Sequence, residues 1–375
     1  MVPPSRRPEP LRPAYGGASL DALVPALRAP AGRRPAWLPG PAQDARQVVL
    51  LVLDGLGWEQ LRAYAARAPV LAGMTGGPIT SVVPTTTATA LTSIALGQPP
   101  AGHGIVGYRL RVAGPSGDEV LNVLRWRTVS GDARSFVPPV AFQPQPAFGG
   151  SHVPVLTRAE FLSTGFTAAH LSGTRQVGWW LPSAMAVDVR RLLSEGQRFV
   201  YVYYDGIDRC AHVYGFDDHY EAELVAADRL VADLRAALPP EAVLVVSADH
   251  GQVRVGQAVS AVDPDVAALA GMMSGEGRFR WLHARPGQAP ELAAAAKERY
   301  AGEAWVWTVD ELDDGGWFGG PLTPVERERL GDVALVPFLP VAYTDPADTG
   351  ELRLVCRHGS LTSAEMLVPC VAGGP

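Results

Sequence analysis

The sequence has few cysteines, and the three that occur, Cys210, Cys356 and Cys370, are scattered along the chain. An odd number of widely spaced cysteines excludes the dense disulfide framework of a small secreted scaffold. No cysteine has a Cys-x-x-Cys partner, so none is included in the site described below. The scarcity of cysteine predicts a reduced protein, and we expect a cytoplasmic location.

Long apolar runs are also missing. The most apolar stretch, residues 48–53, is far too short to span a bilayer. The N-terminus, MVPPSRRPEP, carries basic residues, but no apolar segment follows them, so we predict no secretory signal. The sequence therefore predicts no association with a membrane.

The charges do not gather into long runs of one sign. There are 32 Lys and Arg residues against 38 Asp and Glu residues, and the formal net charge is −6. Such a balance offers no basic surface for a nucleic acid polymer or for an anionic membrane. We see neither an internal repeat nor a low-complexity tract, which excludes a repeat architecture. The oligomeric state cannot be predicted from these features.

The 375 residues, 47% of them hydrophobic, can bury a substantial core, and this length fits one large α/β domain with insertions or two modest domains. Residues 1–45 are rich in Pro and Arg, and we predict an N-terminal arm that lies on the main body. Residues 46–375 are expected to form the main domain. Within it, residues 109–155 and 255–330 fit no regular alternation of strands and helices, and we predict two insertions that cap a site.

Strands and helices alternate along the main domain. Residues 47–53, QVVLLVL, are a continuous apolar run typical of a strand buried on both faces. A helix is predicted over residues 218–238, between two further strands. The other predicted strands are residues 79–83, 199–204, 242–248, 332–338 and 366–372. This order predicts an α/β fold with a large, mostly parallel central sheet and helices on both faces.

Polar residues follow three of these strands directly. They are Asp54, then Asp208 and His212, then Asp249 and His250. Because ligands bind beyond the carboxyl ends of the strands in an open α/β sheet, we expect these side chains to converge. Each motif alone has an ordinary explanation, such as a turn or a helix N-cap. His358, before a glycine, could equally be structural.

Taken together, these residues favour a metal site. Carboxylate oxygens and imidazole nitrogens suit zinc or manganese better than magnesium. Three aspartates and three histidines suffice for two divalent ions, which at about 3.5–4 Å apart can clamp a phosphoryl group.

Three adjacent hydroxyls, Thr85, Thr86 and Thr87, follow Pro84 at a predicted strand-to-helix junction. One of them is either an N-cap or a nucleophile, and the stretch alone does not decide between these roles.

The chain resembles the alkaline phosphatase superfamily over about residues 46–372. The resemblance rests on Asp54, the threonines with GHGIVGY at residues 102–108, Asp208-x-x-x-His212, Asp249-His250-Gly251 and His358-Gly359. Within the superfamily it is most similar to the type I phosphodiesterase/nucleotide pyrophosphatase branch. The resemblance implies an alkaline phosphatase-like fold, which agrees with the predicted α/β sheet.

The resemblance also implies two zinc or manganese sites and a nucleophile. One ion would be held by Asp208, His212 and His358. The other would be held by Asp54, Thr87, Asp249 and His250. In the family the nucleophile occupies the last position of a Pro-x-x-Thr pattern, which is Thr87 here. A helix beginning near Ala88 supports this choice, because its free N–H groups favour negative charge, although a simple N-cap would share the location.

The implied function is hydrolysis of a small phosphate ester or nucleotide through a phospho-threonine intermediate on Thr87. A phosphomonoesterase would use the same residues, and a non-catalytic binding protein could keep the fold. A sulfatase is disfavoured because the chain has no Cys/Ser-x-Pro-x-Arg motif, and a phosphoglycerate mutase would carry serine at position 87.

One position departs from the family pattern. Members that cleave nucleotides usually carry Asn after the GHGI turn, where this chain has Tyr108. Its hydroxyl can donate a hydrogen bond to substrate, or the ring can simply pack at the rim. Tyr203 and Tyr204 likewise could stack on a flat group or belong to the core.

Overall fold

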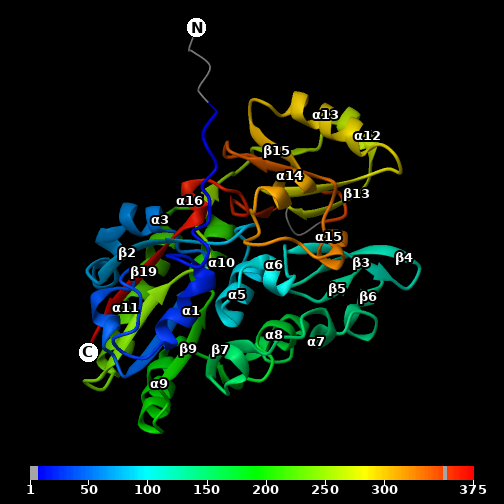
Figure 1. Ribbon diagram of the computed structural model, residues 1–375. Helices are drawn as coiled ribbons and strands as arrows, with labels where there is room; N and C mark the ends of the chain where they lie inside the picture. Colours follow the sequence, from blue (N-terminus) through cyan, green and yellow to red (C-terminus); the bar gives the residue numbers. More distant parts are fainter. Residues whose placement is uncertain (1–6, 349–352) are drawn as a thin grey trace.

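The computed structural model describes residues 7–348 and 353–375, so the first six residues of the predicted arm lie outside it (Figure 1). Its centre is a sheet of seven strands in the order β2-β19-β10-β1-β9-β7-β8. The strands are β1 (Gln47–Leu53), β2 (Thr75–Thr80), β7 (Pro154–Arg158), β8 (Arg175–Trp179), β9 (Phe199–Tyr204), β10 (Ala242–Ser247) and β19 (Leu367–Gly373). The neighbouring pairs are parallel except the two made by β19, so the sheet is mostly parallel, as predicted.

Strand β1 lies in the middle of this sheet. All seven of its residues are buried, and Leu50 is paired with Val245 on one side and Tyr201 on the other. A strand covered on both faces needs apolar side chains in both directions, which explains the unbroken run QVVLLVL. The predicted bounds of this strand are confirmed.

Helices cover both faces of the sheet. Helices α9 and α11 pack together, and α11 also contacts α4, while α5 contacts both α1 and α8. The helices of the main domain are α1 (Leu20–Arg28), α2 (Gly40–Gln43), α3 (Trp58–Ala63), α4 (Pro69–Ala72), α5 (Thr87–Leu96), α6 (Pro100–His103), α7 (Pro139–Phe142), α8 (Gly165–His170), α9 (Met185–Ser194), α10 (Gly206–Tyr214), α11 (Asp218–Ala236) and α16 (Ser363–Met366).

A second sheet forms a separate lobe, coloured yellow and orange in Figure 1. Its antiparallel order is β13-β14-β16-β15. The elements of this lobe are α12 (Pro264–Leu269), β13 (Ala270–Glu276), β14 (Phe279–Ala284), α13 (Ala289–Arg299), β15 (Ala304–Thr308), α14 (Val309–Asp314), α15 (Pro324–Glu328) and β16 (Val333–Pro337), with a small pair made by β12 (Val259–Ala261) and β17 (Ala342–Thr344).

The prediction that residues 332–338 belong to the central sheet was wrong. Strand β16 is buried throughout, as a central strand would be, but it lies between β14 and β15 in the second sheet. Burial sets its apolar composition, and composition does not reveal which of two sheets buries it. Strand β7 and the edge strand β8 of the central sheet were not predicted from the sequence.

A third sheet is a small antiparallel one built by β3 (Arg109–Gly114), β4 (Gly117–Asn122), β5 (Arg127–Thr128) and β6 (Gly131–Asp132). Strand β3 contacts β13, so this sheet lies against the second sheet. After it, the chain returns through α7 to β7, which lies between β9 and β8 in the central sheet.

The described part of residues 1–45 is packed and not free. Helix α1 buries Leu20, Leu23 and Leu27 in the main core. Ahead of it, the amide of Leu11 donates to the carbonyl of Leu361 at 2.9 Å. Within residues 7–348 and 353–375, no helix is both long and apolar enough to cross a membrane.

Candidate active site

Three neighbouring central strands end at one place. Asp54 follows β1, Asp249 and His250 follow β10, and α10 begins directly after β9. The imidazole Nε2 of His250 lies 3.3 Å from Oδ2 of Asp249 and 3.6 Å from Oδ1 of Asp54. The three residues offer ligand atoms that all lie within 4.8 Å of one another. This convergence follows from the parallel register of β10, β1 and β9.

The carboxylates of Asp54 and Asp249 are each satisfied on one oxygen only. Oδ1 of Asp249 accepts hydrogen bonds from the amides of Gly55 and His250, both at 3.0 Å. Oδ2 of Asp54 accepts a short hydrogen bond from the hydroxyl of Tyr203. The opposite oxygens, Oδ1 of Asp54 and Oδ2 of Asp249, are buried and have no hydrogen-bond partner in the described chain. Two orphaned carboxylate oxygens beside one imidazole fit a divalent cation.

The electrostatics agree with this interpretation. Burial raises the pKa of Asp54 well above its ordinary value, and the charges of Asp249 and Asp208 raise it further. Burial likewise raises the pKa of Asp208. Gathering three buried carboxylates is unfavourable unless positive charge compensates them, so the residues present fit a metal site.

A second ligand group adjoins the first. Asp208, His250 and His358 also offer ligand atoms within 4.8 Å of one another. The rings of His250 and His358 are stacked, with centroids 3.6 Å apart. Nδ1 of His358 donates to the carbonyl of Thr85 at 2.8 Å, which leaves Nε2 available as a ligand. His250 therefore belongs to both groups.

His212 lies one helical turn after Asp208 on α10, and its Nε2 is 3.3 Å from Oδ1 of Asp208. Its Nδ1 donates to the carbonyl of Cys356 at 2.7 Å, which orients the ring. The ring centroids of His212 and His358 are 5.3 Å apart. The structure thus brings Asp208, His212 and His358 together. The group whose ligand atoms all lie within 4.8 Å of one another contains His250 in place of His212.

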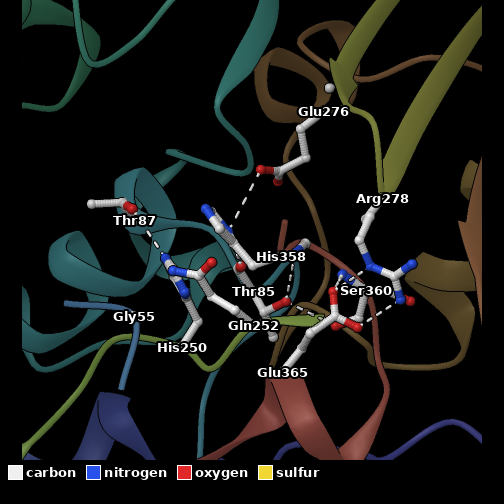
Figure 2. A network of polar contacts seen from close by, with 12 residues as sticks. Gly55, Thr85, Thr87, His250, Gln252, Glu276, Arg278, His358, Ser360 and Glu365 are labelled. Carbon is white, nitrogen blue, oxygen red and sulfur yellow. Dashed lines mark hydrogen bonds and ion pairs between the residues drawn. The ribbon is translucent and has the colours of Figure 1, made fainter. Parts of the chain in front are cut away.

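Thr87 is the first residue of α5, one position before the predicted start. Its Oγ1 lies 3.1 Å from Nε2 of His250, and Figure 2 shows the two side chains pointing toward one another. The helix has no side-chain N-cap hydrogen bond, so the amides of its first turn remain available. The hydroxyl therefore lies beside the ligand groups at the positive end of a ten-residue helix.

The other two threonines differ from Thr87. The hydroxyl of Thr85 donates to the carbonyl of Ser360 at 2.8 Å and accepts from the amide of Gly359 at 3.0 Å. Thr85 thereby ties the loop before α5 to the loop that carries His358 (Figure 2). Thr86 is the residue before the helix, and its side chain makes no cap.

A cavity of about 740 Å³ opens beside this cluster. Asp54, Thr87 and Asp208 are among the residues that line it. Its walls come from the start of α5, from α8, from strands β7 and β9, and from the segment that joins β4 to β5. The volume is in the range of small-molecule sites.

Tyr108, the predicted substrate-binding residue, is not among the residues that line this cavity. Its hydroxyl accepts a hydrogen bond from the side-chain amide of Asn122 at 2.6 Å. A role in substrate binding therefore stays a prediction. His103, in the same GHGIVGY motif, is buried and bonded to Ser93 and to the amide of Ile105, which is a structural role.

Sequence reasoning missed several residues that hold the site in place. Tyr203 fixes Asp54, and Gln252 donates to Oδ1 of Asp208 at 2.7 Å. Because side chains alternate between the two faces of a strand, the sequence of β9 could have placed Tyr203 on the face that carries the site. Its hydrogen-bond partner, Asp54, could not be predicted. Gln252 follows His250 by two residues, and nothing in the sequence marks it.

A buried ion pair connects the second lobe to the His358 loop. Arg278, between β13 and β14, donates to Glu365 at 2.7 and 2.8 Å, and both side chains are fully buried. Glu365 in turn accepts from the amide of Ser360 at 3.0 Å. Figure 2 shows the guanidinium facing this carboxylate, beside the loop that carries His358.

Replacing Tyr203 with phenylalanine should weaken metal binding without unfolding the protein. The variant loses only the hydroxyl that orients Asp54. Loss of an outer-shell partner commonly costs about 10- to 100-fold in metal affinity, and we expect a loss in that range. Titration with a competing chelator measures it. Tyr204→Phe is the matched control, because that hydroxyl bonds Glu223 instead, and equal losses in both variants would contradict the assignment.

Replacing Arg278 with methionine should destabilise the protein by about 3–5 kcal/mol, because Glu365 would remain buried without its partner. Denaturant unfolding measures the loss. The double variant Arg278→Met, Glu365→Gln removes both charges and should recover part of it. If the single variant were as stable as the parent protein, the ion pair would not be the connection that we describe.

Comparison with known proteins agrees with this geometry. The family model described as "Type I phosphodiesterase / nucleotide pyrophosphatase" matches residues 48–359. No curated protein sequence matches the chain.

Solved structures share the fold. Murine ectonucleotide pyrophosphatase/phosphodiesterase 5 superposes with a TM-score of 0.63 at 13% sequence identity, and the match covers 88% of each chain. An inactive variant of that murine protein, in complex with AMP, superposes with a TM-score of 0.64, also at 13% identity and 88% of each chain. Phosphonoacetate hydrolase from Sinorhizobium meliloti 1021, in complex with phosphonoformate, gives 0.59 at 21% identity over 92% of each chain.

The family match spans most of the chain, and the structural matches show that these proteins share its fold. The chain therefore belongs to the type I phosphodiesterase/nucleotide pyrophosphatase family, a family of phosphoester hydrolases.

Proposed function

We propose that this protein is a two-metal phosphodiesterase or nucleotide pyrophosphatase that acts through a phospho-threonine intermediate on Thr87. One observation carries the proposal. Oγ1 of Thr87 lies 3.1 Å from His250, and His250 belongs to both ligand groups. Its position at the junction of two ligand groups and at a helix N-terminus supports a role for this hydroxyl as the nucleophile.

The first group, Asp54, Asp249 and His250 with the hydroxyl of Thr87, would hold one ion. Asp208 and His358, completed by His212 or by the shared His250, would hold the other. The mixture of oxygen and nitrogen ligands favours zinc, with manganese as the other choice. When bound, such ions neutralise charge on phosphoryl oxygens and make a nearby hydroxyl easier to ionise.

The chain's own residues define the two steps. The oxygen of Thr87 loses its proton and forms a bond to phosphorus as the bond from phosphorus to the leaving oxygen breaks, and the leaving oxygen takes up a proton. Water then attacks the same phosphorus, the bond to Thr87 breaks, and a proton returns to the Thr87 oxygen. In both steps the free amides of the first turn of α5 can donate to a phosphoryl oxygen, where negative charge is greatest.

The cavity favours a phosphate that carries an organic group. Apolar side chains such as Leu124 and Phe161 line it, while Arg125 and Arg127 are exposed beside it and suit an anion. The AMP complex of the murine protein supports a nucleotide as one such substrate. A bare phosphate would leave most of this cavity unfilled.

A metal analysis and a substrate screen together test the proposal. Near-stoichiometric zinc or manganese in the purified protein is expected, and an absence of metal after careful preparation would favour a non-catalytic binding protein. Rates on bis-p-nitrophenyl phosphate should exceed those on p-nitrophenyl phosphate. The reverse order would show a phosphomonoesterase, and turnover of phosphonates alone would contradict both.

A further inference from the structure

The cavity extends beyond the ligand groups to a histidine that the mechanism does not use. His170 ends α8, lines the cavity, and is only 4% exposed. Its ring stacks on Phe166, with centroids 3.9 Å apart. The stacking and the burial hold the ring in one orientation.

The tautomer of His170 follows from its one hydrogen bond. Nδ1 lies 2.7 Å from the carbonyl oxygen of Phe166. A carbonyl can only accept, so Nδ1 carries the proton and Nε2 is an acceptor in the neutral ring. Burial lowers the pKa of His170 to about 4, so the ring is neutral at pH 7.

Nε2 of His170 has no hydrogen-bond partner among residues 7–348 and 353–375. The same holds in these ranges for the hydroxyls of Tyr201 and Thr157, which are also buried and line the cavity. Strands β7 and β9 are paired in parallel at Val155 and Tyr201, so Thr157, two residues on, lies on the same face as Tyr201. None of these three atoms is among the fully buried atoms that lack a partner, so each is open to the cavity, where water or a ligand can supply its hydrogen bond.

Apolar side chains make up part of the cavity wall, beside charged residues such as Arg125 and Arg127. The apolar ones include Leu91, Phe161, Phe166 and Leu171. In such surroundings a few polar groups decide which ligand binds, because a ligand that leaves them unpaired loses the hydrogen bonds that both sides made with water.

We propose that Nε2 of His170 accepts a hydrogen bond from an N–H or O–H group on the organic part of the substrate, and so selects phosphoesters that carry such a donor. The inference rests on the proposed function, because it takes the cavity beside Thr87 as the place of the organic group. Tyr201 supplies a donor in the same cavity, which suits a group with a donor and an acceptor on one edge, such as a nitrogen heterocycle.

A matched pair of substrates tests this. The p-nitrophenyl ester of thymidine monophosphate carries a ring N–H, and its N3-methyl derivative does not. We expect kcat/KM for the first to exceed that for the second by about ten- to hundredfold. In His170→Leu the ratio should fall close to one, through loss of activity on the N–H substrate. His170→Gln, which keeps an acceptor, should retain part of the preference.

The ratio separates selection from a structural role. If His170 only supports α8, His170→Leu would lower both rates together and the ratio would persist, which would overturn the proposal. Equal rates of the parent protein on both substrates would also overturn it while leaving the phosphodiesterase function standing. If the parent protein with zinc hydrolyses neither substrate, the proposed function fails and this inference fails with it.

Discussion

Replacing Thr87 with alanine is expected to lower kcat for phosphodiester hydrolysis at least about a thousandfold, while metal content stays at the level of the parent protein. Removal of a nucleophile costs this much or more in enzymes that act through a covalent intermediate. Metal should persist because the carboxylate and imidazole ligands that surround Thr87 are unchanged. Steady-state kinetics and elemental analysis on the same preparation measure both quantities.

Thr86→Ala is the matched control, since Thr86 is buried like Thr87 but its hydroxyl makes no cap to α5. It should keep most of the activity. Thr85→Ala is a less clean control, because Thr85 holds the His358 loop through Ser360 and Gly359. Full activity in Thr87→Ala, or equal losses in the Thr86 and Thr87 variants, would remove Thr87 from the mechanism.

The second large effect is expected at Asp249. Asp249→Asn keeps the volume of the side chain and an oxygen for the amides of Gly55 and His250, but removes the charge. We expect metal affinity to fall at least about a hundredfold, more than for an outer-shell change, and turnover to fall with it. Competition with a chelator measures the affinity.

The same variant should respond differently in the absence of metal. The charge of Asp249 repels that of Asp54 in the folded protein and raises the pKa of Asp54. Removing it should therefore leave the metal-free protein at least as stable as its parent. The parent should gain about 2.7 kcal/mol from zinc at one hundred times its Kd, and the variant should gain at most about 0.4 kcal/mol at that concentration.

Thermal unfolding with and without zinc measures both the stability of the metal-free protein and its stabilisation by zinc. Glu195→Gln is a suitable control, because Glu195 is an exposed carboxylate paired with Arg175 and remote from the ligand groups. A metal-free variant much less stable than the parent would mean that Asp249 serves the fold and not a cation. Unchanged zinc stabilisation would contradict its role as a ligand.

The central part of the fold could be predicted because local patterns of apolar and polar residues determine its strands and helices. The sequence of β1 is apolar almost throughout because both faces of the strand are covered. In α11, apolar residues recur with helical spacing over a long stretch. The polar residues at the strand ends could be placed together because parallel strands share one edge. The family resemblance then assigned the residues to sites, which composition and spacing alone could not do.

The rest could not be predicted because it depends on distant partners. β16 has the composition of a central strand, and only its pairing with β14 and β15 puts it in the second sheet. The tie from Arg278 to Glu365 joins residues far apart in the chain. That Nε2 of His170 is left without a partner follows from the hydrogen bond between Nδ1 and the carbonyl of Phe166, and this bond cannot be predicted from the sequence.

The stereochemistry at phosphorus tests the central claim most directly. A single stereoisomer of a chiral phosphorothioate diester, hydrolysed in isotopically labelled water, reports how many displacements occur at phosphorus. Attack by Thr87 followed by attack of water inverts the configuration twice, so we predict net retention. Net inversion would show that water attacks the substrate directly, and it would contradict the role of Thr87 as nucleophile.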